Sequence, residues 1–93
     1  THLVLLMGLG NSAYKAGDIA AAARAFQQAI AAHPDAAPAY NNLANVLLVQ
    51  KQAQQANDIA EKGLAVVGDD EKVRQQLLQT LAEINDYQNQ HSQ

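Results

Sequence analysis

Apolar residues recur along the chain at intervals of three and four positions, which is the period of amphipathic helices. Five such segments follow one another, and three of the four breaks between them contain glycine, proline or aspartate. The predicted helices cover residues 3–15, a stretch ending near residue 32, a stretch starting near residue 38, residues 53–67 and residues 70–86. The sequence therefore predicts an all-α fold.

The breaks between these segments carry residues suited to helix ends. Gly17 can adopt the left-handed conformation that follows a helix, and Asp18 can accept a hydrogen bond from the free amides of the next one. Pro38 suits a first helical turn, because its missing N–H costs nothing there. Lys51 stands where the first unit has Gly17, so we expect that corner to be looser. Gly68 ends the fourth helix.

The hydrophobic pattern repeats after 34 residues. Leu9 corresponds to Leu43 and Leu77, and Pro34 corresponds to Gly68. A repeat of this length is typical of arrays of helical hairpins. The predicted domain spans residues 1–93, with repeats over 3–36 and 37–70, a capping helix over 71–88 and a frayed tail over 89–93.

The first unit resembles the tetratricopeptide repeat (TPR) family. The match consists of a large apolar residue, a Leu-Gly pair, and small or apolar residues before a proline, namely Leu6, Leu9, Gly10, Ala22, Phe26, Ala29 and Pro34. The second unit matches more loosely, with Gly63 and Gly68 in place of the usual alanine and proline. The resemblance implies a right-handed α-solenoid of two TPR hairpins and a C-terminal capping helix, five helices in all, with a concave binding surface.

The predicted third helix contains three asparagines within five residues, Asn41, Asn42 and Asn45. This is unusual inside a helix, because the side-chain amide competes for nearby backbone groups. If Tyr40, Leu43 and Leu47 pack inward, these asparagines share another face. The same face of the other first helices follows from the 34-residue shift. The predicted peptide groove comprises Met7, Asn11, Tyr14, Lys15, Asn41, Asn42, Asn45, Val49, Lys72, Gln75, Gln76 and Gln79. Amides both donate and accept, which suits an extended peptide backbone; the alternative is a merely solvated face.

The resemblance also suggests what the groove holds. Family members that clamp a peptide's C-terminal carboxylate use Lys, Asn, Asn, Lys and Arg at defined groove positions. Asn11, Asn42 and Lys72 match this set, whereas Met7 replaces the first lysine and Gln76 replaces the arginine. We therefore expect a ligand to be held by its backbone and apolar side chains more than by its terminal charge, although a partial clamp through Lys72 stays open.

The first helix is apolar all round at its start, where Leu3, Val4 and Leu5 predict an interface with something outside these residues. The chain begins at Thr1 in an apolar run, so we expect a fragment of a larger protein. An upstream domain of the same chain, a second copy in weak self-association, or a ligand could cover this run. In some bacterial envelope proteins, repeats of this kind follow papain-like cysteine peptidase domains.

Composition narrows the classes of function. Of the apolar residues, 19 are alanine, which favours closely packed helices. The net charge of -3 disfavours nucleic acid as a partner. The apolar start lacks a basic leader and is too short to span a bilayer, so we expect a soluble protein without membrane insertion. The compartment stays open between bacterial cytoplasm and cell envelope.

Catalytic and metal-binding chemistry has little support in the sequence. The chain has no cysteine, and His2, His33 and His91 have no second ligand at metal spacing. No glycine-rich phosphate loop occurs, and no cofactor is predicted. We interpret the chain as a non-catalytic protein-protein interaction module that binds an extended peptide or a partner helix. The alternatives are a structural appendage that braces a neighbouring domain, and a homo-oligomerisation module.

Overall fold

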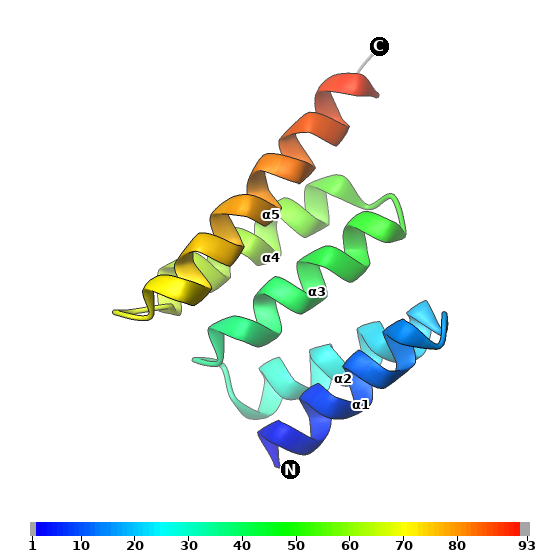
Figure 1. Cartoon of the computed structure of the whole chain (residues 1–93), viewed down its shortest axis with the longest axis vertical. Helices are drawn as coiled ribbons and strands as arrows, with labels where there is room; N and C mark the ends of the chain where they lie inside the picture. The colour runs from blue at the N-terminus through cyan, green and yellow to red at the C-terminus, as the bar shows by residue number, and fades with distance from the viewer. Residues whose placement is uncertain (1, 92–93) are drawn as a thin grey trace.

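The computed structural model describes residues 2–91, and this part of the chain forms five α-helices and no strand. They are α1 (Leu3–Lys15), α2 (Ile19–Ala32), α3 (Ala37–Val49), α4 (Ala53–Val66) and α5 (Glu71–Gln90). Figure 1 shows α1, α3 and α5 side by side in one layer, with α2 and α4 behind them. The predicted all-α class and the predicted helical repeat are confirmed.

The connections before α2 and α5 follow the sequence signals. Gly17 and Gly68 have φ of 86° and 62°, the left-handed region that favours glycine. Asp18 and Asp70 each cap the next helix, accepting hydrogen bonds from the backbone N–H of Ala21 at 3.1 Å and of Val73 at 3.2 Å. These contacts satisfy amide groups that a helix start would otherwise leave without a partner.

Lys51 makes the same turn as Gly17 without glycine's freedom. Its φ is 63°. The backbone N–H of Gln52 donates to the Leu47 carbonyl at 2.9 Å, as that of Asp18 donates to the Ala13 carbonyl at 2.9 Å. Gln52 supplies no side-chain cap to α4. The second hairpin therefore keeps the geometry of the first with poorer residues at its corner.

Small residues allow the helices to approach closely. Ala22, Ala29, Ala56 and Ala60 are completely buried. Gly63 of α4 lies closely against both α3 and α5, because a Cβ built there would lie 2.8 Å from the Tyr40 Cβ and 2.9 Å from a Leu77 methyl. The larger core side chains, such as Phe26, Leu77 and Ile84, fill the space between these approaches.

The last helix is longer than the apolar pattern suggests. It continues to Gln90, so the predicted end at Asp86 is wrong, and residues 89 and 90 of the expected frayed tail are helical. The Tyr87 and His91 rings stack with centroids 4.1 Å apart, and the His91 Nδ1 lies 2.8 Å from the Tyr87 carbonyl oxygen. These local contacts extend the helix without an apolar stripe. Ser92 and Gln93 lie outside the described residues.

Substitution of Gly63 by alanine tests the close approach. The added Cβ must displace either Tyr40 at its Cβ or the Leu77 side chain. We therefore expect Gly63→Ala to lower the free energy of unfolding by about 1 to 3 kcal/mol. The matched control is Gly8→Ala, since no atom lies within 4 Å of a Cβ there. Gly8→Ala should raise stability by about 0.5 to 1 kcal/mol through helix propensity. Urea unfolding followed by circular dichroism measures both, and stabilisation by both variants would contradict the packing argument.

The left-handed lysine gives a second stability prediction. Lys51→Gly should raise the free energy of unfolding by roughly 1 kcal/mol. The substitution removes the steric strain of a left-handed lysine, and this gain exceeds the loss from the greater conformational entropy that glycine gives the unfolded chain. The reciprocal variant Gly17→Lys should lower it by a similar amount. Thermal unfolding should show midpoints that move in opposite directions, and a lower midpoint for Lys51→Gly would contradict this account.

Candidate functional site

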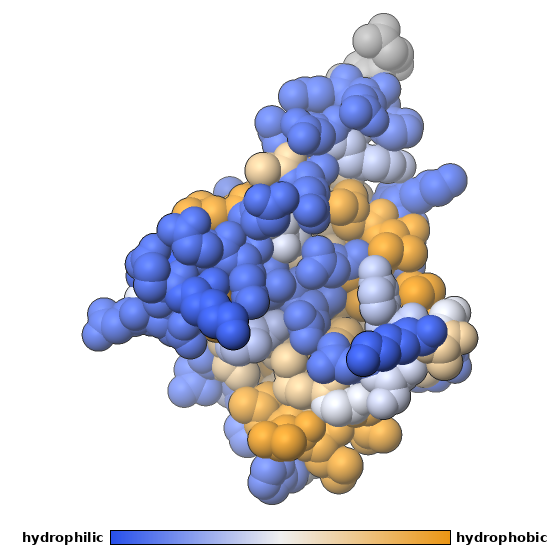
Figure 2. All heavy atoms as spheres, viewed as in Figure 1, coloured by the Kyte–Doolittle hydropathy of each residue, from blue (hydrophilic) through white to orange (hydrophobic). Residues whose placement is uncertain are grey.

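Three hollows follow the layer formed by α1, α3 and α5, where the sequence predicts a groove. Figure 2 shows this layer from the front, with hydrophilic residues over α3 and α5 and a hydrophobic patch over the start of α1. The largest of these hollows, of about 470 Å³, lies between α3 and α5. We call it the amide hollow, and it is lined by Asn41, Asn42, Asn45, Gln75, Gln76, Gln79, Thr80 and Glu83.

The other two hollows involve α1. An apolar hollow of about 380 Å³ is lined by Leu3, Val4, Met7, Gly8, Asn11, Ala36, Pro38 and Ala39. A central hollow of about 160 Å³ is lined by Asn11, Tyr14, Phe26, Asn42, Asn45 and Val46. The central hollow shares Asn11 with the apolar hollow, and it shares Asn42 and Asn45 with the amide hollow. They therefore form a continuous row of cavities from the start of α1 to the middle of α5.

The asparagines of α1 and α3 already contact each other across this row. The Asn42 Nδ2 donates to the Asn11 Oδ1 at 3.3 Å, and the pair is exposed to solvent. An exposed neutral hydrogen bond contributes little net free energy, so a ligand can exchange it for its own at low cost. The two asparagines that match the carboxylate-binding set are thus placed together.

Three other predicted groove residues are not brought into the row. Lys15, Val49 and Lys72 are exposed, but none of them lines the three hollows. The acidic residue Glu83, which the 34-residue shift also places on the groove face of α5, lines the amide hollow. A bound carboxylate would therefore meet a like charge at this end of the row.

Asn41 differs from the other two asparagines of α3 because its side chain is buried, with 8% of its surface exposed. The Thr80 Oγ1 donates to the Asn41 Oδ1 at 2.6 Å. The same hydroxyl lies 3.0 Å from the Gln76 carbonyl oxygen, but its single proton favours the shorter contact. The bond connects α3 to α5, so Asn41 serves packing first and contributes only an edge to the amide hollow.

Thr80 is the residue that the sequence-based prediction missed. The 34-residue shift places it at the position of Val46, which is 1% exposed, so a polar residue in α5 stands where α3 has a buried valine. Thr80 itself is 3% exposed. A polar residue at a buried position needs a hydrogen-bond partner, and Asn41 provides it. The replacement of Val46 by a threonine at the same repeat position was the sequence feature that could have indicated this bond.

The predicted interface at the chain start separates into three environments. Leu3 is half-buried and packs against the cluster that contains Leu6 and Ala29. Val4 lines the apolar hollow. Leu5 is 59% exposed, and Leu9 is 54% exposed although its repeat equivalents Leu43 and Leu77 are buried. Leu5 and Leu9 therefore form an apolar outward face of α1.

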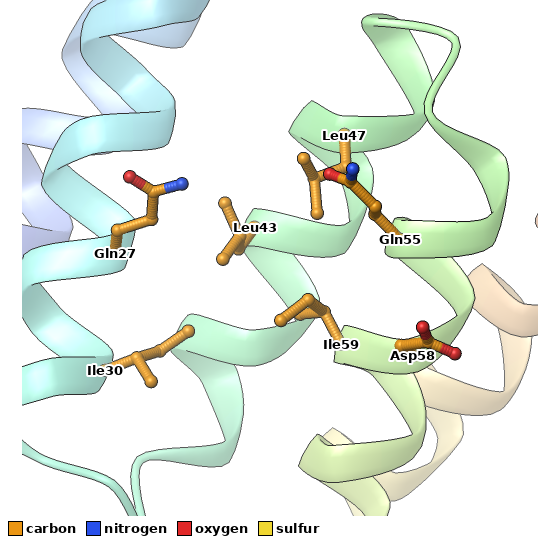
Figure 3. Close-up of a pocket in the computed structure, with 7 residues that line it drawn as sticks. All are labelled: Gln27, Ile30, Leu43, Leu47, Gln55, Asp58 and Ile59. Atoms are coloured by element: carbon orange, nitrogen blue, oxygen red, sulfur yellow. The ribbon is translucent and has the colours of Figure 1, made fainter.

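A further cleft lies on the opposite side of the molecule. Figure 3 shows side chains of α2, α3 and α4 around it, with the two leucines of α3 between the flanking helices. This rear cleft, of about 380 Å³, is lined by Gln27, Ile30, Leu43, Leu47, Gln55, Asp58 and Ile59. The sequence pattern placed its apolar residues in the core, and the leucines are indeed almost fully buried.

Two further features are absent from the described residues: a cluster of metal-ligating side chains and a membrane-spanning helix. Within residues 2–91, no three His, Asp or Glu side chains lie close enough to hold a metal ion. Over the same part of the chain, no helix combines the length and apolar character that crossing a bilayer requires. The hollows thus offer hydrogen bonds and apolar contact.

Comparison with known proteins agrees with this arrangement of helices. A family model described as tetratricopeptide repeat matches residues 7–65, which is more than half of the chain. The match includes α2, α3 and most of α1 and α4. No curated protein matches the chain. Repeats of this kind generally mediate protein interactions and are typically non-catalytic.

The buried bond between α3 and α5 gives a prediction that separates packing from binding. Thr80→Val leaves the Asn41 oxygen buried without a donor, so we expect the free energy of unfolding to fall by about 1 to 3 kcal/mol. Adding Asn41→Leu to Thr80→Val should restore part of that loss, because neither partner then remains unsatisfied. The control Asn42→Ala should change stability by no more than about 0.5 kcal/mol. Equal losses for Asn42→Ala and Thr80→Val, measured by chemical denaturation, would contradict the assignment.

Proposed function

The chain belongs to the tetratricopeptide repeat family, and from this premise we propose that the row of three hollows binds an extended peptide segment of a partner protein, without catalysis. The observation that carries the proposal is the continuity of the row through Asn11, Asn42 and Asn45. We retain the two repeats over residues 3–36 and 37–70 and the capping helix over 71–88 as the proposed units of this module.

The chemistry of the row favours recognition of a peptide backbone. Each asparagine offers a donor and an acceptor, which can pair with the carbonyl and N–H groups of an extended chain whatever its side chains are. In α5 the Gln75 and Gln79 amide nitrogens donate to Glu71 at 2.8 Å and Glu83 at 3.3 Å. These bonds hold the two glutamines in place along the helix.

The two ends of the row suggest the direction of selectivity. The apolar hollow, with Val4 and Met7 in its lining, suits an apolar side chain of the peptide. The amide hollow contains Glu83, and Gln76 stands where carboxylate-binding relatives have arginine. We therefore propose an internal peptide segment as the ligand, with an apolar residue at the α1 end, in preference to a free C-terminus.

Bracing of a neighbouring domain remains the second candidate because α1 exposes Leu5 and Leu9 on its outward face. This surface lies apart from the row, since neither leucine lines any of the three hollows. The two roles are therefore compatible in one molecule. Self-association through the same leucines is the third.

A displayed library of random dodecapeptides, selected against the intact chain, provides the probe for the groove. Selected peptides should lose roughly tenfold or more in affinity to Asn42→Ala or Asn45→Ala, which corresponds to about 1 to 3 kcal/mol for a hydrogen bond that the ligand buries. The unfolding midpoints of these variants should stay near that of the unmodified chain. Isothermal titration calorimetry gives the affinities.

The matched controls lie in the rear cleft, where Gln27→Ala and Gln55→Ala remove amides of the same chemistry. These variants should bind the selected peptides with unchanged affinity. Loss of binding by Gln27→Ala or Gln55→Ala, with none by the asparagine variants, would move the site to the opposite side and overturn the proposal. Peptides whose C-terminal carboxylate is replaced by an amide should bind with the same affinity as peptides with a free carboxylate.

A further inference from the structure

The outward face of α1 is an apolar surface that the proposed groove does not use. Leu5 and Leu9 lie one helical turn apart, and they are 59% and 54% exposed. Their equivalents in the later repeats can be found by the 34-residue shift: Ala39 and Val73 correspond to Leu5, and Leu43 and Leu77 correspond to Leu9. These four equivalents are between 0% and 8% exposed.

The structure shows what covers this face in α5. Leu77 packs against α4 at Gly63, where a Cβ would come within 2.9 Å of the leucine methyl. In the preceding repeat, Ala29 of α2 occupies the position of Gly63 and is completely buried, in one cluster with Ala39 of α3. In both cases the cover is an amphipathic helix that presents a very small residue to the first helix of the next hairpin.

The two ends of the array differ in this respect. Arg74 of α5 stands where Leu6 and Tyr40 face the second helix of their hairpins, and it interacts with Glu71 and the Gly68 carbonyl. Leu78 stands where Gly10 leaves room for the Phe26 ring. A bulky leucine and a charged residue there prevent another helix from approaching α5 in the same way. The face of α1, in contrast, keeps the apolar residues of the repeat.

We propose that Leu5 and Leu9 dock an amphipathic α-helix from outside residues 1–93, with an alanine or glycine opposite Leu9. A second copy of the chain does not supply such a helix. The small residues of α2 and α4 that would make this contact, including Ala29, Ala60 and Gly63, are already buried in the fold. The docked helix extends the array by one layer, independently of any ligand in the groove.

The test inserts a second copy of residues 3–36 immediately before Leu3, which preserves the 34-residue register of the α2 to α3 connection. The inserted hairpin then places its own small-residue helix over the original Leu5 and Leu9. We expect the thermal unfolding midpoint to rise by roughly 10 °C or more, with one cooperative transition.

The same substitution at two sites distinguishes docking from a general effect of length. In the lengthened chain, Leu9→Gln in the original α1 should lower the midpoint by about 10 °C, because this leucine is then buried like Leu43. Leu9→Gln in the inserted copy, whose leucine is still exposed, should leave the midpoint nearly unchanged, as should Leu9→Gln in the 93-residue chain. Equal effects at the two sites of the lengthened chain would overturn the proposal.

Sedimentation equilibrium of the 93-residue chain tests the competing occupant. A monomer at high concentration is expected. A dimer that Leu9→Gln dissociates would identify a second copy as the cover and would overturn the proposal of an outside helix. Neither result affects the groove, whose peptide binding is measured separately with the asparagine variants.

Discussion

The close approach of neighbouring helices through alanine and glycine is the contact on which the rest of this structure depends. Ala29 and Gly63 occupy equivalent positions in α2 and α4, and each lets a first helix of the next hairpin lie against its backbone. Half of the buried apolar residues are alanines, which let the helices lie close enough for many short contacts between them and the larger core side chains. The inward-packing stripe on α1, α3 and α5 is narrow enough to leave open the face on which we propose the groove.

The open face is polar, and several of its side chains already form hydrogen bonds within the protein. Asn42 bonds to Asn11, and Gln75 and Gln79 bond to glutamates of the same helix. Where an amide is buried, at Asn41, a threonine from the next first helix meets it. A ligand thus finds hydrogen-bonding groups that are oriented before it binds, which lowers the ordering cost of association.

The sequence predicted the helices and their hairpin arrangement well, because turn residues and the 34-residue period are local or repetitive signals. The prediction failed for residues whose burial or contacts depend on a neighbouring helix. Periodicity places Asn41 on a face, but only the separation of α3 and α5 determines that Thr80 covers it. Leu9 has the repeat's core signature, yet burial requires a helix before it, and the described residues contain none. The last turn of α5 has no apolar stripe and carries a stacked pair of rings, Tyr87 and His91, which an apolar pattern cannot indicate.

The asymmetry of the two ends follows from the same short contact. A helix that must receive a following partner needs a small residue at its closest point, as Gly10 does beneath the Phe26 ring. Leu78 occupies that point in α5, and it closes the array by steric means while remaining partly exposed itself. A helix that must receive a preceding partner needs large apolar residues instead, since the partner brings the small ones. Leu5 and Leu9 meet that requirement, and so the same rule that stacks the hairpins assigns α5 as the closed end and α1 as the open one.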